Sequence, residues 1–271
     1  MYMGDKEEFM SRVNDLYRFE AIQGHLGWDQ ETIMPVKGAK ARGEILAWLA
    51  GERHSRLIDP ELGELISKLE GGEYDNFFSA NVREMRRKYD EAVKLPTEFV
   101  SELTKARSEA LIAWQKARSE SDFSQFAPHL ENMIQLTHQR IEYLGCQHTP
   151  YDVLLDEYEV GMTVEDYDPL FLGLKDRLVP LLSKIMNSDV EIPRLPETMT
   201  FPIDAQEEFC NRVSKAMGFD FEAGRMDRST HPFCAGLWPD DTRFTTRFDE
   251  KDPFSCLYAV MHESGHGLYE Q

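Results

Sequence analysis

The chain has 271 residues, of which 41% are hydrophobic and 29% are charged, a balance typical of a globular protein rather than a disordered one. The formal net charge of −19 argues against nucleic acid or an anionic membrane as the main partner, because both would repel such a surface. No stretch approaches the roughly 18 apolar residues that a membrane span needs, and the N-terminal residues lack the basic and apolar segments of a signal peptide.

The first 218 residues predict a succession of helices, because apolar side chains recur at spacings of three and four. The first two helices are expected over residues 5–23 and 38–56, with a loop at Met34-Pro35 between them. Asp59-Pro60 has the form of an N-cap followed by proline at the first helical position, and so begins a third helix that ends near residue 71. Later helices are expected over residues 74–94, from 97 past Trp114, and over 126–144, 163–186 and 204–217.

Residues with known capping roles mark several of these helix ends. Thr97 and Thr163 can each cap the helix that follows. Gly145 and Gly218 can each end the helix that precedes them. An extended connection is expected where prolines recur, at Pro193, Pro196 and Pro202.

The pattern changes after Gly218, where residues 219–250 contain turn-forming residues and only short apolar runs. Residues 243–248 alternate as a strand does and can pair with a neighbour near 233–237, which predicts a small antiparallel sheet of two or three strands. Asp252-Pro253 then begins a last helix as N-cap and first helical residue. Its buried stripe is expected to consist of Phe254, Leu257, Tyr258 and Met261.

The four cysteines are widely spaced and form no C-x-x-C pair; they are Cys146, Cys210, Cys234 and Cys256. We interpret them as reduced, partly buried thiols of an intracellular protein rather than as a disulfide framework. Together with the absence of a signal peptide, this predicts a cytoplasmic location.

The last helix contains His262, Glu263 and His266 in the pattern H-E-x-x-H. Residues four apart on a helix lie on one face, so the two imidazoles could hold one metal ion. Zinc binds neutral imidazole nitrogens in tetrahedral geometry and activates water for attack on a carbonyl. Glu263, beside the histidines, could serve as general base and acid, which predicts hydrolysis of a peptide or a similar amide. The alternative is a pair of surface histidines near a frayed helix end.

A catalytic zinc site needs three protein ligands, and this motif supplies two. Glu270 is four residues beyond His266, but it lies about 12 Å along the helix axis from His262, too far for one ion. His231 and Asp241 are possible upstream donors, although no spacing rule supports either. We therefore expect the third ligand beyond Gln271, in a longer parent protein. The present chain would then be an N-terminal fragment with weak or no activity, in which the metal is absent or held by the two histidines with water.

Three motifs follow one another in the C-terminal third of the chain. They are H-P-F at residues 231–233, D-x-R-x-T at 241–245 and H-E-S-G-H at 262–266. Together they resemble the thermostable metallocarboxypeptidases of the carboxypeptidase Taq type. The segments W-D-Q-E-T at 28–32 and Y-D-V-L-L-D-E-Y-E at 151–159 also resemble this family. The likeness covers the whole chain, but only about the first half of a usual family member.

The resemblance implies a mainly helical, zincin-like peptidase scaffold with a small antiparallel sheet next to the H-E-x-x-H helix. It implies a homodimer that removes residues one at a time from peptide C-termini with Zn²⁺ or Co²⁺. His262 and His266 would be metal ligands, Glu263 the base and acid, and a glutamate of a second, H-E-S-Q-like motif the third ligand. His231 and Arg243 would lie near the cleft and contact the peptide substrate.

These expectations give a single mainly helical domain over residues 1–271, the N-terminal part of a longer metallopeptidase. Helices fill residues 1–218, the small sheet and loops fill 219–250, and the metal-binding helix fills 252–271. The expected partners are peptide substrates and a second copy of the chain, with no nucleic acid and no membrane.

Several alternatives remain open for individual residues and for the function. His231 could be a loop residue bonded to backbone, and Asp241 with Arg243 could be a structural ion pair. Trp28 with Asp29 could serve packing and capping, and residues 151–159 could form a structural loop. The rival functions are an oligoendopeptidase-like metallopeptidase and a non-catalytic helical protein that binds a partner or dimerises.

Overall fold

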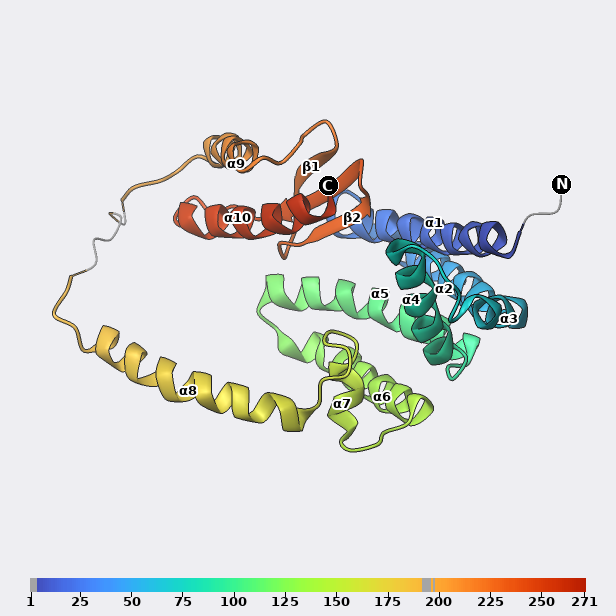
Figure 1. The fold of residues 1–271 in the computed structure, drawn as a ribbon. Helices are drawn as coiled ribbons and strands as arrows, with labels where there is room; N and C mark the ends of the chain where they lie inside the picture. The colour runs from blue at the N-terminus through green and yellow to red at the C-terminus, as the bar shows by residue number, and fades with distance from the viewer. Residues whose placement is uncertain (1–3, 192–195, 197) are drawn as a thin grey trace. The chain divides into compact units, whose positions relative to one another are not determined.

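Apolar stripes at helical spacing fold most of the chain into helices, with one small sheet (Figure 1). The computed structural model describes residues 4–191, 196 and 198–271. In chain order the elements are α1 (Asp5–Thr32), η1 (Val36–Gly38), α2 (Ala39–Leu57), α3 (Pro60–Leu69), α4 (Asn76–Ala92), α5 (Thr97–Glu120), η2 (Phe123–Gln125), α6 (Ala127–Leu144), α7 (Pro150–Leu155), α8 (Val164–Met186), α9 (Ile203–Met217), β1 (Gly224–Arg228), β2 (Cys234–Trp238), β3 (Asp241–Thr246) and α10 (Pro253–Glu270). The predicted mainly helical fold class is confirmed.

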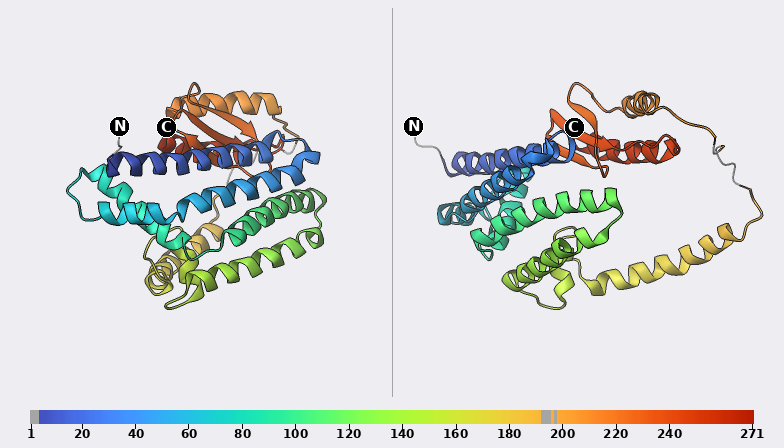
Figure 2. Two further views of the ribbon diagram at one scale, coloured as in Figure 1. Left: turned by 90° about the vertical axis from the view of Figure 1, so that its right-hand side faces the viewer. Right: turned by 180° about the vertical axis from the view of Figure 1, so that it is seen from behind.

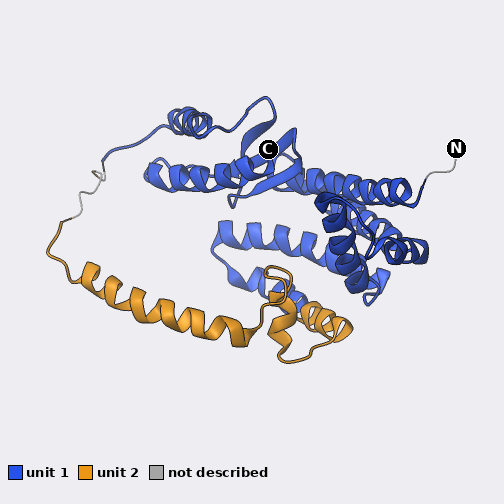
Figure 3. Ribbon diagram, viewed as in Figure 1, with its two compact units in different colours: residues 1–133, 197–271 blue, residues 134–196 orange. Residues whose placement is uncertain are grey.

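The chain divides into two compact units (Figure 3). Unit 1 comprises residues 1–133 and 197–271, and unit 2 comprises residues 134–196. Unit 1 therefore joins the N-terminal helices to the C-terminal sheet and helix, although these lie far apart in the sequence. The expectation of a single domain over residues 1–271 stays a prediction.

The N-terminal helices of unit 1 share one hydrophobic core, and α1 and α2 run side by side in both views of Figure 2. Phe9 and Val13 of α1 belong to this core with Ile66 of α3 and Phe78 of α4. The rings of Phe9 and Phe78 meet edge to face, with centroids 5.6 Å apart. Full burial of one such side chain stabilises the fold by about 1.5–3 kcal/mol, so this core holds α1 firmly in place.

Helix α1 continues to Thr32, whereas the sequence predicted its end near residue 23. The predicted end was wrong: Gly24 lies within α1 and serves packing there. A Cβ atom at position 24 would lie 2.8 Å from Cδ2 of Leu237, so the missing side chain lets α1 approach β2 closely. The second half of α1 thereby reaches the sheet.

Helix α2 carries a buried histidine that connects it to the start of α5. His54 is 5% exposed, and its Nε2 and Nδ1 atoms lie 3.0 Å from the Ala92 carbonyl oxygen and 2.9 Å from Thr97 Oγ1. Burial lowers the pKa of His54 from its ordinary value. Because the Thr97 hydroxyl contacts this ring, the prediction that it caps α5 was wrong; Pro96 stands at that N-cap without a side-chain bond.

Other predicted helix ends are confirmed. Asp59 accepts a hydrogen bond from the Glu61 amide at the start of α3, and Thr163 forms a capping box at the start of α8. Gly145 and Gly218 have φ angles of +81° and +108°, a left-handed conformation that favours glycine after a helix. Of the proline-rich connection, Pro193 lies outside the described residues.

The sheet has three strands in the order β1-β3-β2. Strand β3 pairs antiparallel with β2, as predicted, but parallel with β1, so the expected antiparallel sheet is in fact mixed. The chain reverses between β1 and β2 and again between β2 and β3, which returns β3 to the direction of β1. The sequence Gly224–Arg228 has a single large apolar residue, Met226, and so gave no strand signal.

No helix in the described ranges 4–191 and 198–271 is both long enough and apolar enough to cross a membrane.

Candidate metal centre

Helix α10, which carries the H-E-x-x-H motif, begins where the sequence predicted. The Asp252 carboxylate accepts a hydrogen bond of 3.2 Å from the Ser255 amide, and Pro253 is the first helical residue. The helix then packs against β2, β3 and α9 in unit 1.

The face that α10 buries is not the predicted one. Phe254, Tyr258 and Met261 were expected in its buried stripe with Leu257, yet they are 49%, 68% and 43% exposed. The buried residues are instead mostly small; they are Cys256, Val260, Glu263, Ser264 and Gly267. Close packing on the sheet therefore selects the small residues of α10 and leaves the large ones outside.

Gly267 and Ser264 show how this rotation of α10 is fixed. A Cβ atom at position 267 would lie 2.7 Å from Cε2 of Phe219, so no side chain fits between the helix and that ring. Ser264 Oγ lies 2.8 Å from Ser214 Oγ of α9, and both residues are fully buried. A buried hydroxyl pair of this kind is costly to break, because each hydroxyl would be left buried without this partner.

With this face turned inward, the two histidines of the motif point outward together. His262 and His266 are both exposed, and their Nε2 atoms lie 3.3 Å apart. The ring planes are inclined by 82°, with centroids 4.8 Å apart. The structure thus brings together the two side chains that the sequence identified as metal ligands.

The donor set of these two rings fits a tetrahedral metal ion. Two nitrogens bound to zinc at about 2.0–2.1 Å, separated by the tetrahedral angle, lie roughly 3.3–3.4 Å from one another. The Nε2 separation of 3.3 Å agrees with that geometry. The same distance also suits a direct hydrogen bond in which one ring is protonated at Nε2 and the other is not.

Glu263 is directed toward the sheet rather than outward with the histidines. It is 7% exposed, and its charge contributes to the pKa of Cys234 on β2. Burial, followed by the charges of Glu263 and Glu270, raises the pKa of the Cys234 thiol to about 12. Cys234 is therefore protonated at neutral pH and is not a nucleophile of the site.

Glu270 does not join the histidines. Its carboxylate occupies the space beside Gly236 of β2 where a side chain at that position would stand. Within residues 4–191, 196 and 198–271, no group of three or more His, Cys, Asp and Glu side chains could hold a metal ion. That His262 and His266 are metal ligands, with a third ligand elsewhere, therefore stays a prediction.

Arg243 of β3 is held by structural partners. It donates two hydrogen bonds to the Asp241 carboxylate, at 2.7 and 2.9 Å, and its guanidinium lies 4.2 Å from the centroid of the Trp28 ring. The bonds from Arg243 lower the pKa of Asp241. Since side chains alternate along a strand, Arg243 lies on the opposite face of β3 from Thr242, which faces Gly267 of α10. The structural ion pair is thus present, and a contact of Arg243 with substrate stays a prediction.

His231 is exposed on the loop between β1 and β2. Its carbonyl oxygen accepts a hydrogen bond of 2.6 Å from Ser229 Oγ. Phe233, two residues further along, is bound to β3 by its backbone amide and carbonyl. The H-P-F and D-x-R-x-T segments are therefore in direct contact, which the sequence did not reveal.

Residues 151–159 belong to unit 2, where two of their carboxylates accept hydrogen bonds from backbone amides. Asp152 accepts hydrogen bonds from the amides of Thr149 and Val164, at 2.9 and 2.7 Å, and these bonds lower its pKa. Asp156 likewise accepts from the Gly161 amide at 2.8 Å. The segment is therefore not a loop throughout: residues 151–155 belong to α7 and a turn follows, while a role in lining the cleft stays a prediction.

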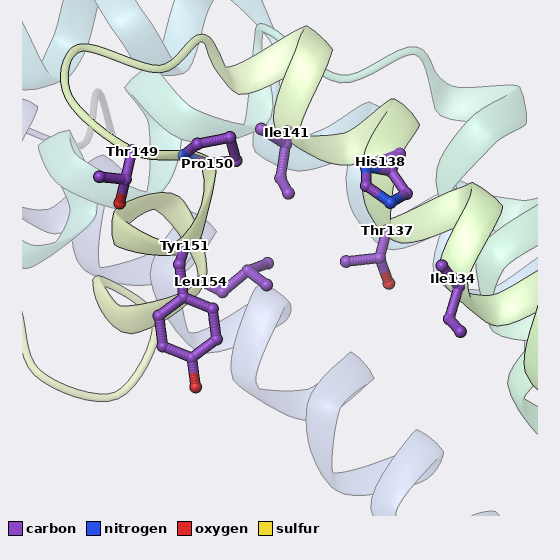
Figure 4. A pocket seen from close by; sticks show the side chains of 8 residues that line it. All are labelled: Ile134, Thr137, His138, Ile141, Thr149, Pro150, Tyr151 and Leu154. Atoms are coloured by element: carbon purple, nitrogen blue, oxygen red, sulfur yellow. The ribbon is translucent and has the colours of Figure 1, made fainter. Parts of the chain in front are cut away.

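Unit 2 also contains an open, largely apolar cavity of about 360 Å³ (Figure 4). It lies between α6 and α7 and is lined by Ile134, Thr137, His138, Ile141, Thr149, Pro150, Tyr151 and Leu154. His138 is its single ionisable side chain apart from the Tyr151 hydroxyl, so the cavity has the character of a packing surface rather than of a reaction site.

Similarity to known proteins covers nearly the whole chain. Thermostable carboxypeptidase 1 of Thermus thermophilus is 38% identical over 261 residues, which are 90% of this chain and 50% of that protein. Carboxypeptidase 1 of Bacillus subtilis is 33% identical over 272 residues, 98% of this chain and 54% of that protein. The crystal structure of BsuCP superposes with a TM-score of 0.95 at 32% identity, covering 98% of this chain and 54% of that one.

The chain thus spans about half the length of the curated relatives that it matches. Residues 8–271 also match the family described as Carboxypeptidase Taq (M32) metallopeptidase. The fold, the H-E-x-x-H helix and these relatives agree, and the chain belongs to the carboxypeptidase Taq (M32) metallopeptidase family.

Proposed function

We propose that this chain supplies the two histidine ligands and the general base of a metal-dependent carboxypeptidase. The observation that carries the proposal is the convergence of the His262 and His266 Nε2 atoms to 3.3 Å on the outward face of α10. The similar proteins of Thermus thermophilus and Bacillus subtilis are both named carboxypeptidases, which favours this reaction over the others considered.

Each side chain of the motif has a distinct task in this proposal. His262 and His266 would hold Zn²⁺, or alternatively Co²⁺, through their Nε2 atoms. When bound, the metal would polarise the scissile carbonyl and make a water molecule a better nucleophile. Glu263 would accept a proton at its carboxylate and return it to the leaving amine. Its burial keeps this carboxylate away from bulk water, which supports a role in proton transfer.

The third ligand is part of the same proposal. A catalytic zinc site uses three protein ligands. On the resemblance to the carboxypeptidase Taq family, we assign the third to a glutamate in an H-E-S-Q-like motif beyond Gln271 in the whole protein. The 271-residue chain alone should then hydrolyse peptides weakly or not at all. Zinc-dependent turnover by this chain, abolished by Glu263→Gln, would count against that assignment.

A comparison of two peptides tests the reaction. The whole protein should shorten a peptide with a free C-terminal carboxylate one residue at a time and leave its C-terminally amidated counterpart intact. The Glu263→Gln variant should bind metal normally and cleave neither peptide. Cleavage of the amidated peptide at internal bonds would instead favour an oligoendopeptidase-like enzyme. No metal-dependent cleavage of either peptide would favour the non-catalytic alternative.

Assembly and location complete the proposal. We propose a homodimer or other oligomer, supported by the apolar side chains of Phe254, Tyr258 and Met261 that α10 leaves exposed. Light scattering that shows a strict monomer at high concentration would contradict it. A cytoplasmic location is supported by the four cysteines, which are all free thiols.

A further inference from the structure

Strand β3 carries three fully buried threonines, at positions 242, 245 and 246. The hydroxyls of Thr242 and Thr246 have no hydrogen-bond partner among the described residues. The hydroxyl of Thr245 has several: its Oγ1 atom lies 2.6 Å from Ser229 Oγ and accepts a bond of 3.1 Å from the Phe233 amide. Thr245 is thus distinguished from its neighbours by its contacts with the loop that carries His231.

The direction of each hydrogen bond in this group follows from counting protons. Ser229 Oγ donates its single proton to the His231 carbonyl oxygen at 2.6 Å, so in its contact with Thr245 it must be the acceptor. The Thr245 hydroxyl has two acceptors within reach, Ser229 Oγ at 2.6 Å and the Phe233 carbonyl oxygen at 3.4 Å, and its single proton goes to the nearer one. Thr245 therefore donates to Ser229 and accepts from the Phe233 amide. The bonds run in one sense, from the Phe233 amide through the two hydroxyls to the His231 carbonyl. Such a chain strengthens each of its members.

Backbone bonds tie both ends of the same loop to β3. The Thr245 amide donates to the Phe233 carbonyl at 2.8 Å, and the Ser229 amide donates to the Thr246 carbonyl at 2.9 Å. The segment from Ser229 to Phe233 is therefore closed onto β3 at its two ends, and the Thr245 hydroxyl lies inside the closure.

The loop held in this way ends beside the catalytic helix. His231 precedes Cys234 by three residues, so their Cα atoms are at most about 11 Å apart. Cys234 in turn packs against the buried cluster that contains Val260 of α10, one helical turn before Glu263. His231 is exposed, while its backbone is fixed through its carbonyl oxygen. We propose that Thr245 is a positioning residue that holds the 229–233 loop so that the His231 ring is presented to the peptide substrate beside Glu263.

This inference rests on the proposed function, because presentation of His231 matters only if a peptide binds there. The Thr245→Val variant removes the hydroxyl with little change of shape, and Thr245→Ser restores it. Thr246→Val is the matched control, because Thr246 lies on the same strand and is as completely buried as Thr245. Its hydroxyl, however, has no hydrogen-bond partner among the described residues. Removing a buried hydroxyl that makes no hydrogen bond should leave the free energy of unfolding unchanged or raise it slightly.

Amide hydrogen exchange and the NMR signals of the His231 ring in the 271-residue chain give the first readout, which needs neither metal nor turnover. Thr245→Val should speed exchange at the Phe233 amide about tenfold, the effect of losing one hydrogen bond of typical strength, and should shift the His231 signals. Thr245→Ser should return both to wild-type values, and Thr246→Val should leave both unchanged. Wild-type behaviour of Thr245→Val, or an equal effect of Thr246→Val, would overturn the inference.

Kinetics of the whole protein give the second readout. Thr245→Val should raise KM more than it lowers kcat, because a displaced His231 weakens contact with the peptide and leaves the metal ligands in place. An equal loss of kcat/KM in Thr246→Val would contradict the positioning role. If the whole protein cleaves no peptide, the proposed function fails, while the exchange data still decide whether Thr245 fixes the loop.

Discussion

Two regions of unit 1 use histidine in opposite ways. His54 is buried, and each of its ring nitrogens has a protein partner, the Ala92 carbonyl and the Thr97 hydroxyl. His262 and His266 are exposed, and their Nε2 atoms face each other. The surroundings of a histidine side chain, rather than its residue type, therefore determine whether it is structural or available to a ligand. His54 has no donor atom to spare for a ligand, whereas the pair on α10 offers two.

Removing one ring of the pair should have the largest effect. We expect His262→Ala or His266→Ala to weaken Zn²⁺ binding by at least about 100-fold, because a direct ligand contributes more than the outer partners whose loss costs 10–100-fold. Isothermal titration of the 271-residue chain measures this affinity. His138→Ala, which removes an exposed histidine in unit 2, is the control and should bind as the wild type does.

His54→Ala should produce the reverse pattern. It leaves a cavity and deprives the Ala92 carbonyl and the Thr97 hydroxyl of a partner, so we expect a loss of about 2–4 kcal/mol in the free energy of unfolding. Zn²⁺ affinity should not change. Urea denaturation followed by circular dichroism measures the first quantity. If His54→Ala had normal stability and impaired Zn²⁺ binding, the structural role assigned to His54 would be contradicted.

Two glycines of α10 sharpen the contrast between its buried and exposed faces. Gly267→Ala places a methyl group 2.7 Å from the Phe219 ring, and we expect a loss of about 1–3 kcal/mol in stability. Gly265→Ala meets no atom within 4 Å and should instead gain up to about 1 kcal/mol from helix propensity. Thermal unfolding of the two variants should therefore shift in opposite directions. Equal shifts would mean that the rotation of α10 is assigned incorrectly.

The pH dependence of stability provides the smallest expected effect. Burial and the charge of Arg53 lower the pKa of His54, opposed by the Ala92 carbonyl and Glu98. The unfolded chain then takes up this proton more readily than the folded chain. The stabilisation is complete above the ordinary histidine pKa of about 6.5 and is lost as pH falls below it. Between pH 7 and 5 the wild type should lose more stability than His54→Gln; parallel curves would refute this.

The sequence predicted most helices and the shared face of His262 and His266, because caps and paired histidines act over one or two helical turns. Asp252, Thr163 and the 262–266 motif are examples, since each depends on neighbours within four residues. The mixed pairing of the sheet and the buried face of α10 depend on partners that are distant in sequence. Large apolar residues suggested the wrong face, whereas Ser264 and Gly267 would have indicated the right one.

Contacts between motifs were also beyond the reach of the sequence. Thr245 and Phe233 are twelve residues apart, and nothing in their spacing reveals that one hydroxyl joins them. The pairing of Ser214 with Ser264 spans fifty residues. In each case the partner of a small polar residue is determined only by the fold.

X-ray absorption at the zinc edge tests the central claim most directly. The 271-residue chain with one equivalent of Zn²⁺ should show two imidazole nitrogens at about 2.0–2.1 Å, and oxygen donors in the remaining positions. The number should fall to one in His262→Ala and in His266→Ala and stay at two in His138→Ala. A spectrum that is the same in the wild type and in His262→Ala and His266→Ala would show that the metal binds elsewhere, and the pair on α10 would not be its site.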